Sequence, residues 1–307
     1  MQWNIPSPEV LARRLAPREG LLDMVLDTDT YNEVDDQFAL CYSLLSPTRL
    51  NVQAVYAAPF HNDRSTSPGD GMEKSYDEIL RLMRAMGRAP EGMVYKGSTS
   101  YLPNGDTPVD SPAARDLVQR GMARAQDDPL YVVAIGAITN VASALLMEPR
   151  LAEKIVVVWL GGDPLHYPHT QEFNLSQDVP AARVIFDCGA PVVLIPCMGV
   201  ASHLLVSVQE LALYLGGQNP VCDALVKLTG EYHDDHFAWS KEIWDISTIA
   251  YMVNPDWMPS VLMHSPLLTD DSHWAQDTRR HMIRVAYFAE RNAIFRDMYR
   301  KLRGEAQ

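Results

Sequence analysis

Acidic residues crowd one short segment near the start of the chain: Asp27, Asp29, Glu33, Asp35 and Asp36. The segment follows the apolar run 24–26 and precedes an apolar-periodic stretch, which is the pattern of a strand, a loop and a helix. Carboxylates this close repel one another, so a positive partner is expected among them: a cation, a bound proton or basic side chains. A hard metal ion is the simplest of these. A helix N-terminus also attracts acidic residues, but one capping carboxylate is enough for that purpose.

The remaining elements place this loop at the edge of a sheet. Short apolar runs, often β-branched, predict buried strands at 22–26, 52–57, 130–135, 155–160 and 192–196. Helical spacing of apolar residues predicts helices at 75–86, 113–125 and 181–186, with surface loops at 61–71 and 102–112. The alternation predicts an open, mainly parallel, Rossmann-like α/β sheet with helices on both faces, in a single domain over 1–307. Loops after the strands of such a sheet meet at one edge, so residues distant in sequence can share a site there.

Charge and cysteine usage exclude several classes of protein. The 307-residue chain has a net charge of −13, whereas nucleic-acid binding needs clustered Lys and Arg, so no nucleic-acid partner is expected. Four dispersed cysteines without a Cys-x-x-Cys pair predict reduced core thiols. The first residues lack a basic region followed by an apolar run, and polar residues divide the apolar tract 130–147. We therefore expect a cytoplasmic protein that does not enter a membrane.

Several motifs, in order along the chain, resemble the inosine-uridine preferring nucleoside hydrolase family. The acidic loop resembles that family's Asp-x-Asp-Pro-Gly-x-Asp-Asp signature. Further matches lie at 94–97 (Val-Tyr-Lys-Gly), 136–140 (Gly-Ala-Ile-Thr-Asn), 157–162 (Val-Val-Trp-Leu-Gly-Gly), 172–174 (Glu-Phe-Asn) and Asp245. Each fragment alone is weak evidence, but the ordered set extends over most of the chain.

The resemblance implies an enzyme that hydrolyses the N-glycosidic bond of a ribonucleoside to ribose and free base. It implies a calcium ion held by Asp29, Asp36, Asp245 and the backbone carbonyl of Ile135, with Asp29 as the base that activates a calcium-held water. Substrate contacts are implied at Asp35, Asn62, Glu172 and Asn174. His166 falls near a further sugar-binding asparagine of the pattern and departs from it, and Trp244 is expected to contact substrate because it neighbours Asp245. For Asn62, Glu172 and Asn174, capping and turn roles compete with sugar binding. The implied partner is a small-molecule ribonucleoside, and the implied assembly is a homodimer or homotetramer.

The acidic loop is longer than the family signature. Asp29 and Asp35 are six positions apart, where the signature has four. Asn32 or Glu33 could therefore alter the metal or sugar contacts.

The sequence also departs from the family at the residue that usually protonates the leaving base. Trp244 stands where many members use a histidine to protonate the departing base, and an indole cannot supply that proton. Stacking by Trp239 or Trp244, or a histidine within 232–236, are the alternatives.

Two other functions fit part of the sequence. Asp27 and Asp29 after an apolar strand also resemble the first motif of haloacid-dehalogenase-type phosphatases, with Asp27 as nucleophile, Asp29 as acid/base and magnesium as the ion. That interpretation leaves Asp35 and Asp36 without a role and lacks a clear late Gly-Asp-x-x-x-Asp motif. A non-catalytic binding protein would keep the cation and sugar contacts but lack the acid for the leaving base. The nucleobase is not predicted, because base contacts come from divergent loops.

Overall fold

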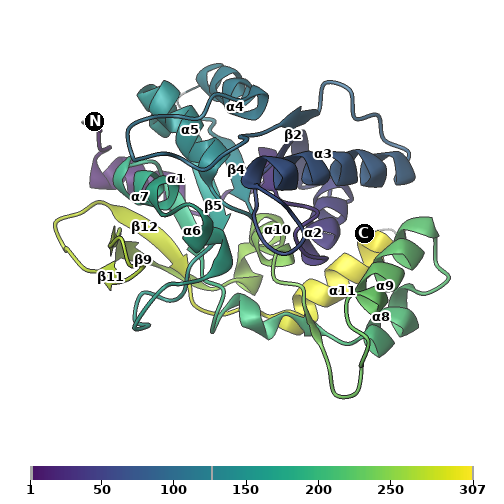
Figure 1. Cartoon of the computed structure of the whole chain (residues 1–307). Helices are drawn as coiled ribbons and strands as arrows, with labels where there is room; N and C mark the ends of the chain where they lie inside the picture. The colour runs from purple at the N-terminus through teal and green to yellow at the C-terminus, as the bar shows by residue number, and fades with distance from the viewer. Residues whose placement is uncertain (1–2, 126, 306–307) are drawn as a thin grey trace.

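A mainly parallel sheet lies at the centre of the molecule (Figure 1). The computed structural model describes residues 3–125 and 127–305. In the described residues the strand order is β3-β2-β1-β4-β5-β6-β12-β9, and neighbours are parallel except β12 and β9. The sheet consists of β1 (Leu22–Thr28), β2 (Leu50–Ala57), β3 (Val94–Lys96), β4 (Leu130–Ala134), β5 (Ile155–Leu160), β6 (Val192–Ile195), β9 (Ser260–His264) and β12 (Met282–Ala286). Two short antiparallel pairs are β7 (Leu205–Val206) with β8 (Lys241–Glu242) and β10 (Leu267–Leu268) with β11 (Trp274–Ala275).

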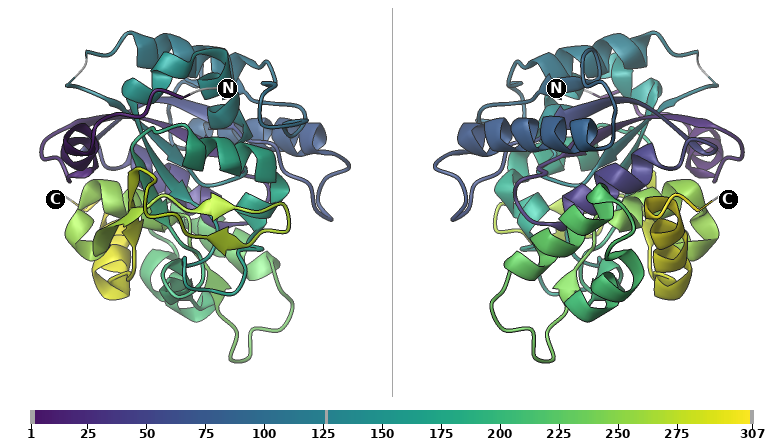
Figure 2. Two further views of the ribbon diagram at one scale, coloured as in Figure 1. Left: turned by 90° about the vertical axis from the view of Figure 1, so that its left-hand side faces the viewer. Right: turned by 90° about the vertical axis from the view of Figure 1, so that its right-hand side faces the viewer.

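Helices cover both faces of this sheet, as predicted (Figures 1 and 2). The helices are α1 (Pro8–Leu15), α2 (Asp35–Leu44), α3 (Pro68–Ala85), α4 (Pro112–Met122), α5 (Thr139–Met147), α6 (Phe173–Gln177), α7 (Val179–Asp187), α8 (Val208–Leu215), α9 (Pro220–Glu231), α10 (Ile246–Val253) and α11 (Arg291–Leu302). Short 3₁₀ turns lie at Pro149–Glu153, Ala201–His203 and Pro255–Trp257. One buried apolar cluster packs α2, α3, α10 and α11 on one face, and a second packs α4, α5 and α7 on the other. The predicted α/β class is confirmed.

The predicted strands correspond to β1, β2, β4, β5 and β6. Each is apolar along most of its length because helices bury both faces of the sheet. The predicted core thiols are also confirmed, because all four cysteines are buried and free.

Some boundaries differ from the sequence prediction. Helix α3 begins at Pro68, inside the predicted loop 61–71, because Ser67 caps it by accepting a hydrogen bond from the backbone N–H of Asp70. Helix α4 ends at Met122 rather than at residue 125. Three strands of the sheet were not predicted: β3, at one edge, and β9 and β12, which complete the sheet beyond β6.

The segment between α9 and β8 projects from the body of the molecule as a long loop (Figure 2). It carries Tyr232 and Trp239, which face the cavity described below. Among the described residues, no helix has the length and apolar character needed to cross a bilayer.

Candidate active site

A cavity of about 300 Å³ opens at the carboxyl ends of β1, β4, β5 and β6. Its walls come from the loop after β1, the residue after β4, the first turn of α6, the projecting loop and the start of α10. The lining residues are Asn32, Glu33, Asp35, Asp36, Ile135, Leu160, Glu172, Phe173, Asn174, Cys197, Tyr232, Trp239, Lys241, Glu242, Trp244 and Asp245. The sheet edge therefore gathers most of the residues that the sequence singled out.

Three buried carboxylates meet at the floor of this cavity. Oxygens of Asp35, Asp36 and Asp245 all lie within 4.8 Å of one another. Asp35 and Asp36 open α2, and Asp245 immediately precedes α10. Asp35 joins the two helices, because its Oδ2 accepts hydrogen bonds from the backbone N–H groups of Trp244 (3.1 Å) and Asp245 (3.4 Å). Opposite ends of the chain thus contribute to one anionic cluster.

Asp29 lies beside this cluster, directly after β1. Its side chain is buried, and neither carboxylate oxygen has a hydrogen-bond partner among the described residues. Gly136 leaves room for it, since a Cβ there would lie 2.7 Å from Asp29 Oδ1. Two unpartnered oxygens in a buried position indicate that this carboxylate serves a ligand.

Burial and mutual repulsion raise the pKa of all four carboxyl groups. Burial, followed by repulsion from Asp35, raises the pKa of Asp36 to about 8. Burial also raises the pKa of Asp35 to about 6, against the attraction of the Lys241 ammonium group. The pKa values of Asp29 and Asp245 rise well above the usual range for the same two reasons. A cation among these groups would relieve the repulsion and favour their ionised forms.

The donor set fits a hard metal ion. The carbonyl oxygen of Ile135 accepts a hydrogen bond from Asn174 Nδ2 at 3.2 Å, which leaves it a second lone pair. Asn174 also donates to the carbonyl oxygen of Leu160 at 3.0 Å, so its amide fixes the ends of β4 and β5. Carboxylate and carbonyl oxygens of this kind are the ligands that calcium and magnesium take.

Lys241 is a site residue that the sequence analysis missed. Its side chain is only 2% exposed, and it forms ion pairs with Glu33 and, at 3.3 Å, with Glu242. The ammonium group also lies 4.4 Å from the centre of the Tyr232 ring. Surrounding carboxylates raise the pKa of Lys241, so it stays protonated. The sequence did not indicate that Lys241 is buried, because its ion-pair partner Glu33 is distant along the chain.

Glu172 caps helix α6, which is one of the two roles that its sequence position left open. Its carboxylate accepts hydrogen bonds from the backbone N–H groups of Asn174 (2.8 Å) and Leu175 (3.1 Å) at the start of α6, and from Gly162 (2.7 Å). It also lines the cavity. Trp244 lines the opposite side, and its buried indole N–H has no partner among the described residues.

The structure separates Asn62 and His166 from the acidic cluster. Asn62 Nδ2 donates to Asn32 Oδ1 at 2.7 Å, so Asn62 supports a residue of the cavity wall without lining the cavity itself. His166 is exposed and lines a different, mostly apolar cavity of about 230 Å³. Of the histidines within 232–236, His233 and His236 both contact the ring of Trp239 and do not line the acidic cavity.

Residues 24–296 match the inosine-uridine preferring nucleoside hydrolase family. The chain belongs to this family. It is therefore a hydrolase acting on N-glycosyl compounds, and the resemblance found in the sequence is confirmed. This nucleoside hydrolase is similar to the pyrimidine-specific ribonucleoside hydrolase RihA of Escherichia coli O1:K1, with 25% identity over 78% of this chain and 82% of the relative. The RihA of Salmonella dublin is 26% identical over 76% of this chain and 80% of the relative.

Solved structures share the fold. A plant nucleoside hydrolase, PpNRh1, has a TM-score of 0.73 and 19% identity, and the match covers 92% of this chain and 98% of that one. A purine-preferring ribonucleoside hydrolase from Gardnerella vaginalis has a TM-score of 0.71 and 21% identity over 92% of this chain and 98% of the other.

The phosphatase interpretation is not supported. Family membership assigns the chain to N-glycosyl hydrolysis. The geometry agrees, because Oδ1 of Asp27, the required nucleophile, accepts a hydrogen bond from Asn140 Nδ2 at 2.7 Å, so Asp27 serves the packing of β1 against α5.

Proposed function

We propose that this nucleoside hydrolase cleaves the N-glycosidic bond of a ribonucleoside to ribose and free base, with Asp29 as general base. The observation that carries the proposal is a buried, unpartnered Asp29 beside the cluster of Asp35, Asp36 and Asp245. The three clustered carboxylates line the cavity, and Asp29 lies behind them without lining it. Cleavage of this bond develops positive charge on the sugar, which an anionic cavity stabilises.

We propose calcium as the resident ion, held by Asp29, Asp36, Asp245 and the carbonyl of Ile135. The unpartnered oxygens of Asp29 support this assignment, as do oxygens of Asp36 and Asp245 that lie within 4.8 Å of each other. When bound, the ion would lower the pKa of an attacking water and fix its place.

In the proposed reaction, Asp29 takes a proton from the attacking water. Its carboxylate has no competing hydrogen bond among the described residues, so one oxygen would hold the ion while the other accepts the proton. The close approach of Gly136 fixes the position of the carboxylate.

The cavity lining contains two sets of residues, polar and aromatic, which match the sugar and the base of a nucleoside. The carboxylates of Asp35 and Glu172 and the Oδ1 of Asn174 present oxygen acceptors that match sugar hydroxyls. Tyr232, Trp239 and Trp244 present aromatic surface that matches a nucleobase. The indole N–H of Trp244 is a donor without a partner among the described residues, so it can hydrogen-bond an acceptor on the base but cannot protonate it.

A screen of purine, pyrimidine and modified nucleosides for released reducing sugar, with calcium added, tests the function. We expect turnover of at least one nucleoside. The Asp29→Asn variant should lose about 10² to 10⁴ of kcat, because it removes the base and leaves the cavity intact. Asp63→Asn, at an exposed position, serves as the matched control.

The alternative weighed from the sequence, a binding protein that keeps the cation and sugar contacts without catalysis, rests on Trp244, which cannot protonate a leaving base. Family membership argues against it. Saturable nucleoside binding without sugar release across the whole screen would establish it. Near-full activity of the Asp29→Asn variant would instead remove Asp29 from the role of base while leaving the enzyme function in place.

A further inference from the structure

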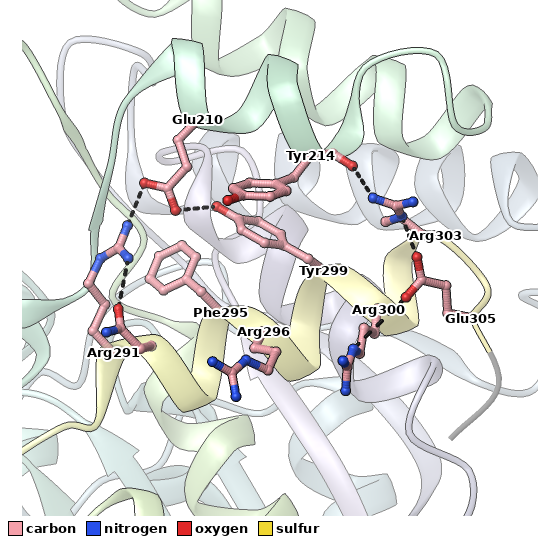
Figure 3. Close-up of a pocket in the computed structure, with 10 residues that line it drawn as sticks. Glu210, Tyr214, Arg291, Phe295, Arg296, Tyr299, Arg300, Arg303 and Glu305 are labelled. Atoms are coloured by element: carbon pink, nitrogen blue, oxygen red, sulfur yellow. Dashed lines mark hydrogen bonds and ion pairs between the residues drawn. The ribbon is translucent and has the colours of Figure 1, made fainter.

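A second cavity, of about 340 Å³, lies between α8 and α11 (Figure 3). We call it the arginine cavity, lined by Glu210, Tyr214, Arg291, Asn292, Phe295, Arg296, Tyr299, Arg300, Arg303 and Glu305. It shares no lining residue with the acidic cavity. Its volume falls within the range of about 300–1,000 Å³ typical of small-molecule sites.

The charge of the arginine cavity is opposite to that of the whole chain. Four guanidinium groups face two carboxylates, whereas the chain carries a net charge of −13. Arg291 is neutralised by Glu210 at 2.6 Å, and Arg303 by Glu305 at 2.7 Å. A local excess of positive charge therefore remains on α11.

Arg296 and Arg300 carry this excess. They lie one turn apart on α11, and both are exposed. Arg296 has no hydrogen-bond or ion-pair partner among the described residues, and Arg300 reaches Glu305 only at 4.0 Å (Figure 3). Arg300 lies in the last turn of α11, where it complements the helix dipole, but Arg296 lies mid-helix and gains nothing from that effect.

An aromatic platform lies next to these groups. The rings of Tyr214 and Tyr299 stack with their centres 5.3 Å apart and their planes at 24° (Figure 3). Tyr299 is buried, whereas 44% of Tyr214 remains exposed, so part of its ring is open to a ligand. A planar group could stack there while an anionic group reaches the arginines.

We propose that the arginine cavity is a second binding site, for a phosphorylated ligand with a planar ring, of the mononucleotide class. Phosphate matches the paired, fork-shaped donors of two neighbouring guanidinium groups. A planar base matches the exposed ring of Tyr214. The proposal does not depend on the hydrolase mechanism, because the two cavities are separate.

Titration calorimetry of the full chain with AMP, adenosine and inorganic phosphate tests this site. The double variant Arg296→Gln/Arg300→Gln should bind AMP at least about tenfold more weakly, because it loses two charge-assisted contacts. Tyr214→Ala should weaken AMP binding but leave phosphate binding unchanged. Arg84→Gln removes an exposed arginine from the last turn of α3 and should bind AMP like the native protein.

AMP binding that the double variant retains in full, or no AMP binding at millimolar concentration, would overturn the proposal. Adenosine that binds as tightly as AMP, and weakens equally in the double variant, would overturn the phosphate assignment. The double variant should keep its nucleoside hydrolysis. An Asp36→Asn variant should keep its AMP affinity, which separates this site from the catalytic one.

Discussion

At the scale of single residues, Lys241 partly offsets the negative charge of the acidic cavity. Among the described lining residues it is the one cation in a cavity that also contains Glu33, Asp35, Asp36 and several further carboxylates. Its ammonium group fixes the long loop after β1 through Glu33 and attracts Asp35. The loop after β1 is two residues longer than the family signature and more polar. Lys241 of β8 gives Glu33 in this loop a buried ion-pair partner, which explains how the fold accommodates the longer loop.

A double-mutant cycle of Lys241→Met and Glu33→Gln tests this pairing. We expect a coupling free energy of unfolding of about 1 kcal/mol or more, because Lys241 is buried while Glu33 remains partly solvated. Urea denaturation of the two single variants and the double variant measures it. The exposed pair Arg13–Asp127, at 3.5 Å, is the matched control and should show almost no coupling. Additive effects at Lys241 and Glu33 would show that the ion pair does not stabilise the loop.

At the scale of elements, the turn from β4 into α5 positions the proposed base. Gly136 lies in this turn, and a Cβ there would lie 2.7 Å from Oδ1 and 2.9 Å from Cγ of Asp29. The backbone carbonyl of Gly136 also accepts a hydrogen bond from Trp159 Nε1 at 3.1 Å, so the turn cannot move away freely. The carboxylate would have to move instead.

Gly136→Ala should therefore displace Asp29 and lower kcat/KM by about tenfold or more. Crowding in this packed turn should also cost about 1–3 kcal/mol of stability. Steady-state kinetics and urea denaturation measure the two effects. Gly105→Ala is the control, because a Cβ at Gly105 meets nothing within 4 Å. Equal kinetics for the two variants would contradict the close packing of Gly136 against the base.

The elements also show what the sequence could predict. Strands β1, β2, β4, β5 and β6 were predictable because burial between two helical layers makes them mostly apolar. Strand β12 was missed because Arg284 interrupts it, and β9 because much of this edge strand is exposed. The start of α3 was missed because its first turn is polar and rich in glycine, although Ser67 and Pro68 are a capping signal.

The sequence could predict those site residues that lie directly after a strand. Asp29, Ile135 and Asp36 come directly after β1 and β4 or at the start of α2, so the topology brings them to one edge. Lys241 and the separation of His166 depend on how long loops fold over that edge. No periodicity in the sequence encodes those contacts.

At the scale of the whole molecule, the acidic cavity links stability to pH and to metal. The pKa of Asp36, about 8 in the folded protein, lies above the usual value of 3.8. The folded protein therefore holds a proton that the unfolded chain has released, so the free energy of unfolding falls as pH rises towards 8. The pKa of His281 is lowered to about 4 and has the opposite effect, but that effect is complete above pH 6.5.

Between pH 6.5 and 8, the metal-free protein should lose on the order of 1 kcal/mol of stability through Asp36 alone. Calcium should reverse this loss, because it binds the ionised carboxylates and so stabilises the folded state more at pH 8 than at pH 6.5. Urea denaturation at both pH values, with EDTA and with calcium, measures the difference. The Asp36→Asn variant should show a smaller pH dependence and a smaller calcium effect. An equal calcium effect at both pH values would mean that the cation binds without displacing protons, and the proposed ligands Asp29, Asp36 and Asp245 would then not hold it.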